Sequence, residues 1–250
     1  MLKILVIAVL LLFVASRLLP RLGSLLGQQA RKPARQARWM WSWFAGSEAE
    51  ALEAERDYGR ECAREFARDF AGAVPDEMQR VVSEVGGCLA RAVNDPRREF
   101  QVTVVASPKT NAYALPGGFI FVTRPLLELC ARRDEVAFLV GHEMGHILRG
   151  HAREQLAVGT FLTAVTARLA GAGQMLREVL GKGYSRDLEL EADREAVRLG
   201  RLAGFDPAAG VALFTRLAQF SPDPSGLGEY FATHPPFAER VREVEKARRG

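Results

Sequence analysis

The chain has 250 residues, of which 48% are hydrophobic, enough for one domain of about 190 to 200 residues behind an N-terminal extension. Its net charge of +4 does not indicate a nucleic-acid-binding protein, because the arginines alternate with acidic residues along predicted helices. Cys62, Cys88 and Cys130 are odd in number and lack ligand spacing, so they are expected to be buried free thiols and not a disulfide framework.

Residues 1–19 are predicted to be a membrane anchor or a signal peptide, because an apolar run from Ile4 to Ala15 lies between Lys3 and Arg17. This run is short for a membrane span, but no A-x-A cleavage pattern follows it. An uncleaved single-pass anchor is therefore favoured. The alternative is a cleaved signal peptide, which would place the protein in the periplasm.

Residues 20–46 are expected to form a juxtamembrane linker that contacts membrane lipid. Six basic residues lie between positions 17 and 38. By the positive-inside rule they favour a cytoplasmic location for the domain that follows. The aromatic cluster from Trp39 to Phe44 is typical of a membrane interface or of a packing contact with that domain.

Residues 47–250 are predicted to form one mainly helical domain. Ser47 and Glu50 have the spacing of a capping box, which starts a helix lasting to about residue 72. An apolar stripe from Met78 to Val93 predicts the next helix.

Three extended segments are expected after these helices. Residues 100–106 are rich in Val, and residues 112–115 and 118–122 flank Pro116-Gly117, which would turn or bulge the chain.

The motif His142-Glu143-Met144-Gly145-His146 lies on a predicted helix with Asp134 as its N-cap and an apolar run at 136–140. At about 100° per residue, positions 142 and 146 differ by about 40° around the helix and lie one turn apart. Their imidazoles can therefore bind the same zinc ion. Glu143 is predicted to be the general base that takes a proton from the attacking water.

A second predicted helix, with Ser185 as N-cap, carries Glu189 and Asp193 beside an apolar stripe. A carboxylate at the border of a buried stripe needs a cation, and zinc held by two imidazoles is the obvious partner. Glu189 is therefore predicted to be the third ligand, and Asp193 to accept the free N–H of one ligand imidazole. Glu191 and Glu195 are expected to meet solvent and to pair with arginines.

The extended zinc-protease pattern with a third histidine does not fit this chain. It would require glycine at position 149 and histidine at position 152, which are Arg149 and Ala152. His151 would lie roughly 140° around a continuous helix from His146, so it cannot share the metal without breaking the helix. It is interpreted as a structural or exposed residue.

Residues 156–176 form a second apolar stretch that Arg168 interrupts. It is interpreted as a helix that covers the site or as a re-entrant membrane contact. Two further helices, at about 207–220 and 236–248, complete the expected architecture.

Four motifs in chain order resemble those of the membrane-associated zinc metallopeptidases that include the CAAX prenyl protease, HtpX and BepA. They are Asn111-Ala-Tyr-Ala-Leu-Pro-Gly-Gly-Phe-Ile-Phe-Val122, the HExxH helix, Ser185-Arg through Glu189-x-x-Ala-Asp193, and Thr233-His-Pro-Pro236 with Arg240 downstream. The resemblance covers the chain from about residue 60 to its C-terminus. No helical-repeat array follows the predicted domain, unlike in BepA.

The resemblance implies a gluzincin fold, mainly α with a small antiparallel sheet (α+β), whose edge strand binds an extended peptide beside the zinc. By similarity, Asn111 and Ala112 are expected to contact the substrate. His234 is expected to approach the metal, as a fourth ligand at rest or as a stabiliser of the oxyanion. From the residues alone, a structural role at the entry to a helix is the alternative.

These features predict a zinc-dependent endopeptidase with one Zn²⁺ per chain. Its expected substrates are extended or misfolded proteins at a membrane, in protein quality control. The alternative is a protease-like chaperone or adaptor that binds unfolded chains with little cleavage. The presence of Glu143 argues against that alternative.

Overall fold

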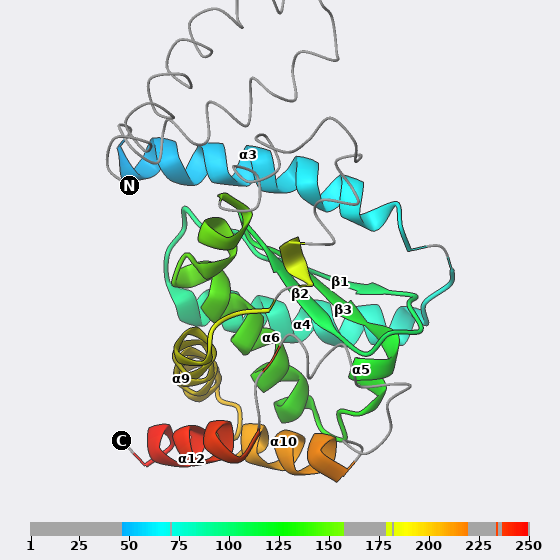
Figure 1. Ribbon diagram of the computed structural model, residues 1–250, viewed down its shortest axis with the longest axis vertical. Helices are drawn as coiled ribbons and strands as arrows, with labels where there is room; N and C mark the ends of the chain where they lie inside the picture. Colours follow the sequence, from blue (N-terminus) through cyan, green and yellow to red (C-terminus); the bar gives the residue numbers. More distant parts are fainter. Residues whose placement is uncertain are drawn as a thin grey trace, which may run out of the picture.

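The computed structural model describes residues 47–70, 72–157, 179–181, 183–219, 234 and 237–249. The predicted anchor and linker, and nearly all of the apolar stretch at 156–176, lie outside the described residues. Within the described ranges, no helix is both long and apolar enough to cross a membrane. The labelled elements are α3 (Glu48–Ala67), α4 (Asp76–Val93), β1 (Gln101–Val105), β2 (Ala112–Leu115), β3 (Phe119–Thr123), α5 (Arg124–Glu128), α6 (Arg133–Leu148), α9 (Arg186–Leu202), α10 (Ala209–Gln219) and α12 (Phe237–Ala247) (Figure 1).

The described strands form a three-stranded sheet in the order β1-β3-β2, so β2 lies at an edge. The chain turns between the two extended segments expected at 112–122, because β2 and β3 pair antiparallel on either side of Pro116–Gly118. The expectation of a purely antiparallel sheet was wrong, because β1 pairs parallel with β3. The connection at 106–111 joins β1 at one edge of the sheet to β2 at the other edge, and the chain reverses its direction there. Because β2 and β3 are antiparallel, β1 and β3 run in the same direction.

The two faces of the sheet pack against different helices. Ala112 and Ala114 of β2 belong to the core that includes α4 and α6, whereas Tyr113 and Leu115 belong to a second core with Phe66 of α3. This separation follows from the alternation of side chains along a strand. The molecule is therefore layered, with α3 on one face of the sheet and α4 and α6 on the other (Figure 1).

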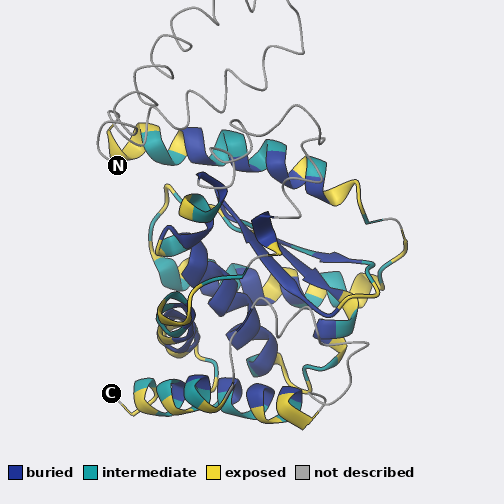
Figure 2. Ribbon diagram, in the orientation of Figure 1, coloured by how far each residue is buried: buried dark blue, intermediate teal, exposed yellow. Residues whose placement is uncertain are grey.

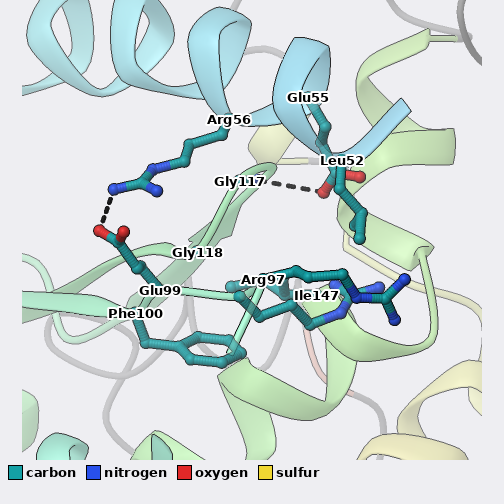
Figure 3. A pocket seen from close by; sticks show the side chains of 10 residues that line it. Leu52, Glu55, Arg56, Arg97, Glu99, Phe100, Gly117, Gly118 and Ile147 are labelled. Atoms are coloured by element: carbon teal, nitrogen blue, oxygen red, sulfur yellow. Dashed lines mark hydrogen bonds and ion pairs between the residues drawn. The ribbon is translucent and has the colours of Figure 1, made fainter. Parts of the chain in front are cut away.

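The helix α3 is fixed to the sheet at the turn between β2 and β3. The Glu55 carboxylate accepts a hydrogen bond from the backbone N–H of Gly117 at 3.0 Å (Figure 3). A Cβ atom added at Gly59 would lie 1.9 Å from the Pro116 carbonyl oxygen, so only glycine allows this contact. The backbone of the helix therefore rests directly on the turn.

The predicted N-cap of α3 is correct, whereas that of α6 is not. The capping box of α3 is confirmed, because the Glu50 N–H donates to Ser47 Oγ and the Ser47 N–H donates to the Glu50 carboxylate. Asp134 is not the N-cap of α6, which begins at Arg133. Its carboxylate instead accepts the N–H of Asp206 at 2.9 Å, before α10.

The three cysteines are free, as predicted, but only Cys62 is fully buried.

The helix α6 is buried along most of its length, as its dark blue ribbon shows (Figure 2). It packs closely against α9, because a Cβ atom added at Gly141 would lie 3.2 Å from Ala196 Cα. One added at Gly145 would lie 3.0 Å from Ala192 Cα. Glycines on α6 and alanines on α9 thus allow the two backbones to approach each other.

Replacing Gly145 with alanine is predicted to destabilise the metal-free protein by about 1 to 3 kcal/mol, because the added methyl group forces α6 away from α9. The affinity for the metal should also fall, because the same movement separates Glu189 on α9 from the two histidines on α6. Urea unfolding and metal titration measure the two effects.

The matched control is Gly87→Ala on α4, where the added Cβ meets no atom closer than 3.6 Å. This change should be neutral or stabilising, because alanine favours a helix interior by up to about 1 kcal/mol. Equal effects of the two substitutions would contradict the close approach of α6 and α9.

Candidate metal centre

Two helices bring the predicted ligands together. His142 and His146 lie one turn apart on α6, and Glu189 lies in the first turn of α9. The two Nε2 atoms are 3.1 Å apart, and each lies 3.4 Å from a carboxylate oxygen of Glu189. Ligand atoms at about 2.0–2.1 Å from a tetrahedral metal are separated by about 3.3 Å, so these three side chains have the required spacing.

His234 completes the group, although it comes from a distant part of the chain. Its Nδ1 lies 2.8 Å from Glu189 Oε2. One ligand atom from each of His142, His146, Glu189 and His234 lies within 4.8 Å of the others, and all four residues are buried. The structure therefore places His234 with the three predicted ligands.

The donor set suits a metal ion. Imidazole nitrogens and a carboxylate oxygen are typical ligands of first-row divalent metals, and burial at this site leaves little water to solvate the Glu189 charge. Glu143 follows the first ligand on α6, and among the described residues its Oε1 is buried without a hydrogen-bond partner. Such an atom is expected to have a partner that enters the site with the metal or the substrate.

Asp193 lies behind the candidate ligands. Its Oδ1 is 2.9 Å from Nδ1 of His142, one turn of α9 after Glu189. A carboxylate in this position accepts the N–H of the ligand imidazole and directs its other nitrogen towards the metal. The geometry is that predicted from the four-residue spacing of the two acidic residues.

Arg240, to which the sequence interpretation gave no role, joins the two carboxylates. Its Nη2 donates to Asp193 Oδ1 at 2.6 Å, and its Nη1 lies 3.2 Å from Glu189 Oε2. The guanidinium group also lies over the Phe214 ring, 4.4 Å from its centroid. The available signal was its position downstream of the Thr-His-Pro segment, which places it in the first turn of α12.

Burial and the surrounding charges shift the pKa values of the acidic groups in opposite directions. Burial raises the pKa of Glu143. Burial also opposes ionisation of Glu189 and Asp193, but interactions with His234, Arg240 and the two imidazoles of α6 outweigh it for Glu189, and interactions with Arg240 and His142 do so for Asp193. The pKa values of both carboxylates are therefore lowered. The site thus favours an ionised carboxylate at the metal position (Glu189), a second one behind it (Asp193), and a more basic carboxylate beside it (Glu143).

The pKa values of the two imidazoles of α6 are also shifted in opposite directions. Burial lowers the pKa of His146 to about 3. Burial and Arg240 also disfavour protonation of His142, but its hydrogen bonds to Asp193 and Glu189 outweigh them and raise its pKa to about 9. Because a metal binds the neutral imidazole, His142 is the ligand whose proton the metal must displace.

Tyr184 is a second residue that the sequence interpretation did not include. Its ring stacks on the His146 imidazole at 3.8 Å between centroids and 15° between planes. Its hydroxyl oxygen is buried and has no hydrogen-bond partner among the described residues. The signal in the sequence is its place directly before Ser185, which is the N-cap of α9 as predicted but makes no side-chain cap bond.

The prediction that Glu195 meets solvent was wrong. Glu195 pairs with Arg149 and Arg198, as expected, but is buried because α6 lies against its side of α9. Of the two alternatives for His151, the structural one agrees with its burial, and its Nδ1 lies 3.1 Å from Nδ1 of His146.

Asn111 and Ala112 lie at the start of the edge strand β2 and are buried. Asn111 donates its backbone N–H to Thr123 Oγ1 and accepts the Ala112 N–H on its side-chain oxygen. Neither residue belongs to the metal-binding group.

Comparison with known proteins identifies the family. The sequence pattern of peptidase family M48 matches residues 76–248, a range that includes the three predicted ligands and His234. The chain belongs to this family. Membership agrees with the gluzincin-type fold and with the mainly helical domain described above.

Relatives in family M48 are named as metalloendopeptidases or proteases. Mitochondrial metalloendopeptidase OMA1 of Schizosaccharomyces pombe is 30% identical over 156 residues, which are 59% of this chain and 46% of OMA1. Metalloprotease LoiP of Escherichia coli is 27% identical over 180 residues, 67% of this chain and 69% of LoiP. A putative beta-barrel assembly-enhancing protease of Vibrio cholerae is 27% identical over 190 residues, 68% of this chain and 39% of that protein. The match thus spans less than half of the OMA1 protein.

Replacing Arg240 with methionine is predicted to destabilise the metal-free M48 domain by about 3 to 5 kcal/mol at pH 7, because two buried carboxylates lose their cation. The folded-state pKa values of Glu189 and Asp193 are lowered, so their ionised forms stabilise the fold above the unfolded values. The loss should therefore shrink as the pH falls below about 4, where the carboxylates take up protons.

Urea unfolding over a pH series measures this difference. The control is Arg194→Met, which removes an exposed arginine that pairs with Glu243 at 3.3 Å. It should cost at most about 1 kcal/mol at any pH. If Arg240→Met cost no more than this control, the proposed electrostatic role of Arg240 would be wrong.

Proposed function

We propose that the protein is a zinc-dependent endopeptidase, in which His142, His146 and Glu189 hold one Zn²⁺. The observation that carries this proposal is the convergence of these three buried side chains, with Glu143 beside them. Two imidazoles and one carboxylate form a known catalytic zinc set.

Glu143 is proposed as the general base. A zinc ion in this site would polarise the scissile carbonyl and lower the pKa of the attacking water. Glu143 takes the proton of that water and returns it to the leaving amine. Its raised pKa suits the first step, because a more basic carboxylate accepts the proton of the water more readily. The protonated carboxyl group then gives this proton to the amine nitrogen as the C–N bond breaks.

His234 is proposed to act on the open side of the site. Its position 2.8 Å from Glu189 supports either a fourth ligand in the resting enzyme or a group that stabilises the oxyanion of the transition state. Asp193 is proposed to orient His142, and Arg240 to hold Asp193 and Glu189 in place.

The proposed substrates are extended or misfolded proteins, bound as an added strand along the edge of β2. The edge position of β2 supports this, because an edge strand offers backbone groups to a peptide of any sequence. Asn111 and Ala112 are proposed to contact the peptide. The named metalloendopeptidase relatives support the reaction class, and we propose a role in protein quality control.

We propose that residues 1–19 anchor the protein in a membrane, that residues 20–46 contact its lipid, and that residues 47–250 are the peptidase domain. The basic residues after the apolar run support a domain on the cytoplasmic side. Cleavage of residues 1–19 would instead release the domain into the periplasm.

The variant Glu143→Gln is predicted to lower the cleavage rate of an unstructured protein such as casein by at least about 10²-fold, because the amide cannot accept the proton. Zinc content and casein binding should stay as in the wild type. Cleavage is followed by gel electrophoresis, zinc by atomic absorption and binding by anisotropy of labelled casein.

The matched control is Glu128→Gln, which makes the same chemical change at an exposed residue of α5 and should leave cleavage unchanged. Cleavage by Glu143→Gln at the wild-type rate would refute the mechanism. If the wild-type protein binds casein without cutting it, the chaperone or adaptor function is the correct one.

The variant His234→Ala is predicted to change kcat while zinc stays bound, because His142, His146 and Glu189 remain. Zinc content after dialysis and kcat on a fluorescent peptide are the two measurements. Zinc loss equal to that of His142→Ala would contradict this role and make His234 an essential ligand.

A further inference from the structure

All four histidines of the chain gather at the metal site. Three of them belong to the metal-binding group, and the fourth, His151, lies behind it. Its Nδ1 is 3.1 Å from Nδ1 of His146, and its Nε2 is 3.5 Å from a carboxylate oxygen of Glu191 on α9.

A break in the chain direction makes this contact possible. The helix α6 ends at Leu148, and Gly150 adopts a positive φ of 81° before a new helical segment begins at His151. A residue with a side chain rarely adopts this conformation, so glycine favours the break. On a continuous helix, His151 would point away from His146.

The roles of the four ring nitrogens follow from the metal position. The Nε2 of His146 faces His142 and Glu189, so its Nδ1 must carry the proton when the metal binds. This N–H donates to Nδ1 of His151, which must then be unprotonated. The proton of His151 therefore sits on Nε2 and points to Glu191.

This chain of contacts differs from the one behind the other ligand. The His142 imidazole faces the ionised carboxylate of Asp193, which Arg240 also contacts. The His146 imidazole faces a neutral acceptor, and Tyr184 stacks on its ring. Ring stacking limits tilting of the imidazole but does not prevent a half-turn of the ring about its Cβ–Cγ bond, which would place a carbon atom where each nitrogen was. The hydrogen bond to His151 distinguishes the two orientations.

We infer that His151 is a positioning residue that fixes the tautomer and orientation of His146, and that Glu191 in turn fixes the tautomer of His151. The inference rests on the proposed metal site. The acceptor role of His151 can be tested independently of proteolysis, because it predicts metal affinity.

The experiment compares His151→Ala, which removes the acceptor, with His151→Asn, whose side-chain oxygen can replace Nδ1. Zinc affinity is measured by competition with a chromophoric chelator. The stability of each metal-free variant is measured by thermal unfolding, and kcat and KM on a fluorescent peptide are recorded. The expected result is a 10- to 100-fold loss of zinc affinity for the alanine variant, typical of a lost partner of a ligand histidine. Asparagine should restore most of it.

Glu191→Gln provides a second test that does not depend on the folding of the His151 variants, because the Glu191 side chain is 43% exposed. The amide oxygen is a weaker acceptor for the His151 Nε2–H than a carboxylate, and the amide NH2 can stabilise the other tautomer, so zinc affinity should fall, by less than in His151→Ala. The control is Glu154→Gln, which removes the same charge from an exposed residue near His151. Glu154→Gln should leave the zinc affinity close to that of the wild type.

Three results would overturn the inference: wild-type zinc affinity in His151→Ala, equal losses in the alanine and asparagine variants, or equal effects of Glu191→Gln and Glu154→Gln. A pure packing role would instead lower the unfolding temperature of metal-free His151→Ala and His151→Asn without separating their zinc affinities. If the wild-type protein binds zinc but cleaves nothing, the proposed function fails and the affinity pattern still decides the role of His151.

Discussion

The close approach of α6 and α9 is the constraint on which the site depends. The two candidate ligand histidines are on one helix and the candidate ligand carboxylate is on the other, and they meet because Gly141 and Gly145 leave room for the α9 backbone. Larger side chains at these positions would move Glu189 away from both imidazoles. Glycine lowers the intrinsic stability of a helix, so burial of α6 on nearly all sides must offset that cost.

Bringing two helices so close also buries several charged groups, and one arginine compensates two of them. Arg240 contacts both Asp193 and Glu189, and its guanidinium lies over Phe214. Buried ion pairs contribute little net stability, but loss of one partner is costly. The last helix is therefore tied to the site electrostatically, although none of its own side chains is among the predicted ligands.

The two candidate ligand histidines have chemically different hydrogen-bond partners. One imidazole faces a carboxylate, and the other faces His151, which reaches Glu191 near the surface. A carboxylate makes its histidine more basic, whereas a neutral partner orients the ring with less effect on its charge. The proposed mechanism needs a metal that stays electrophilic. This need is consistent with His142 being strongly polarised by a carboxylate and His146 only weakly by a neutral imidazole.

The sequence by itself determined the helix that carries His142 and His146, the helix that carries Glu189, and the spacing of Asp193, because all of these depend on the period of an α-helix. It also determined the turn around Pro116 and Gly117. Only the tertiary structure decided the parallel pairing of β1, the burial of Glu195 and the contacts of Tyr184, His151 and Arg240. The pairing of β1 depends on the direction that the connection after it takes, and the His151 contact depends on the break at Gly150. The other contacts join segments far apart in sequence. Such features have no local period, so a sequence pattern does not reveal them.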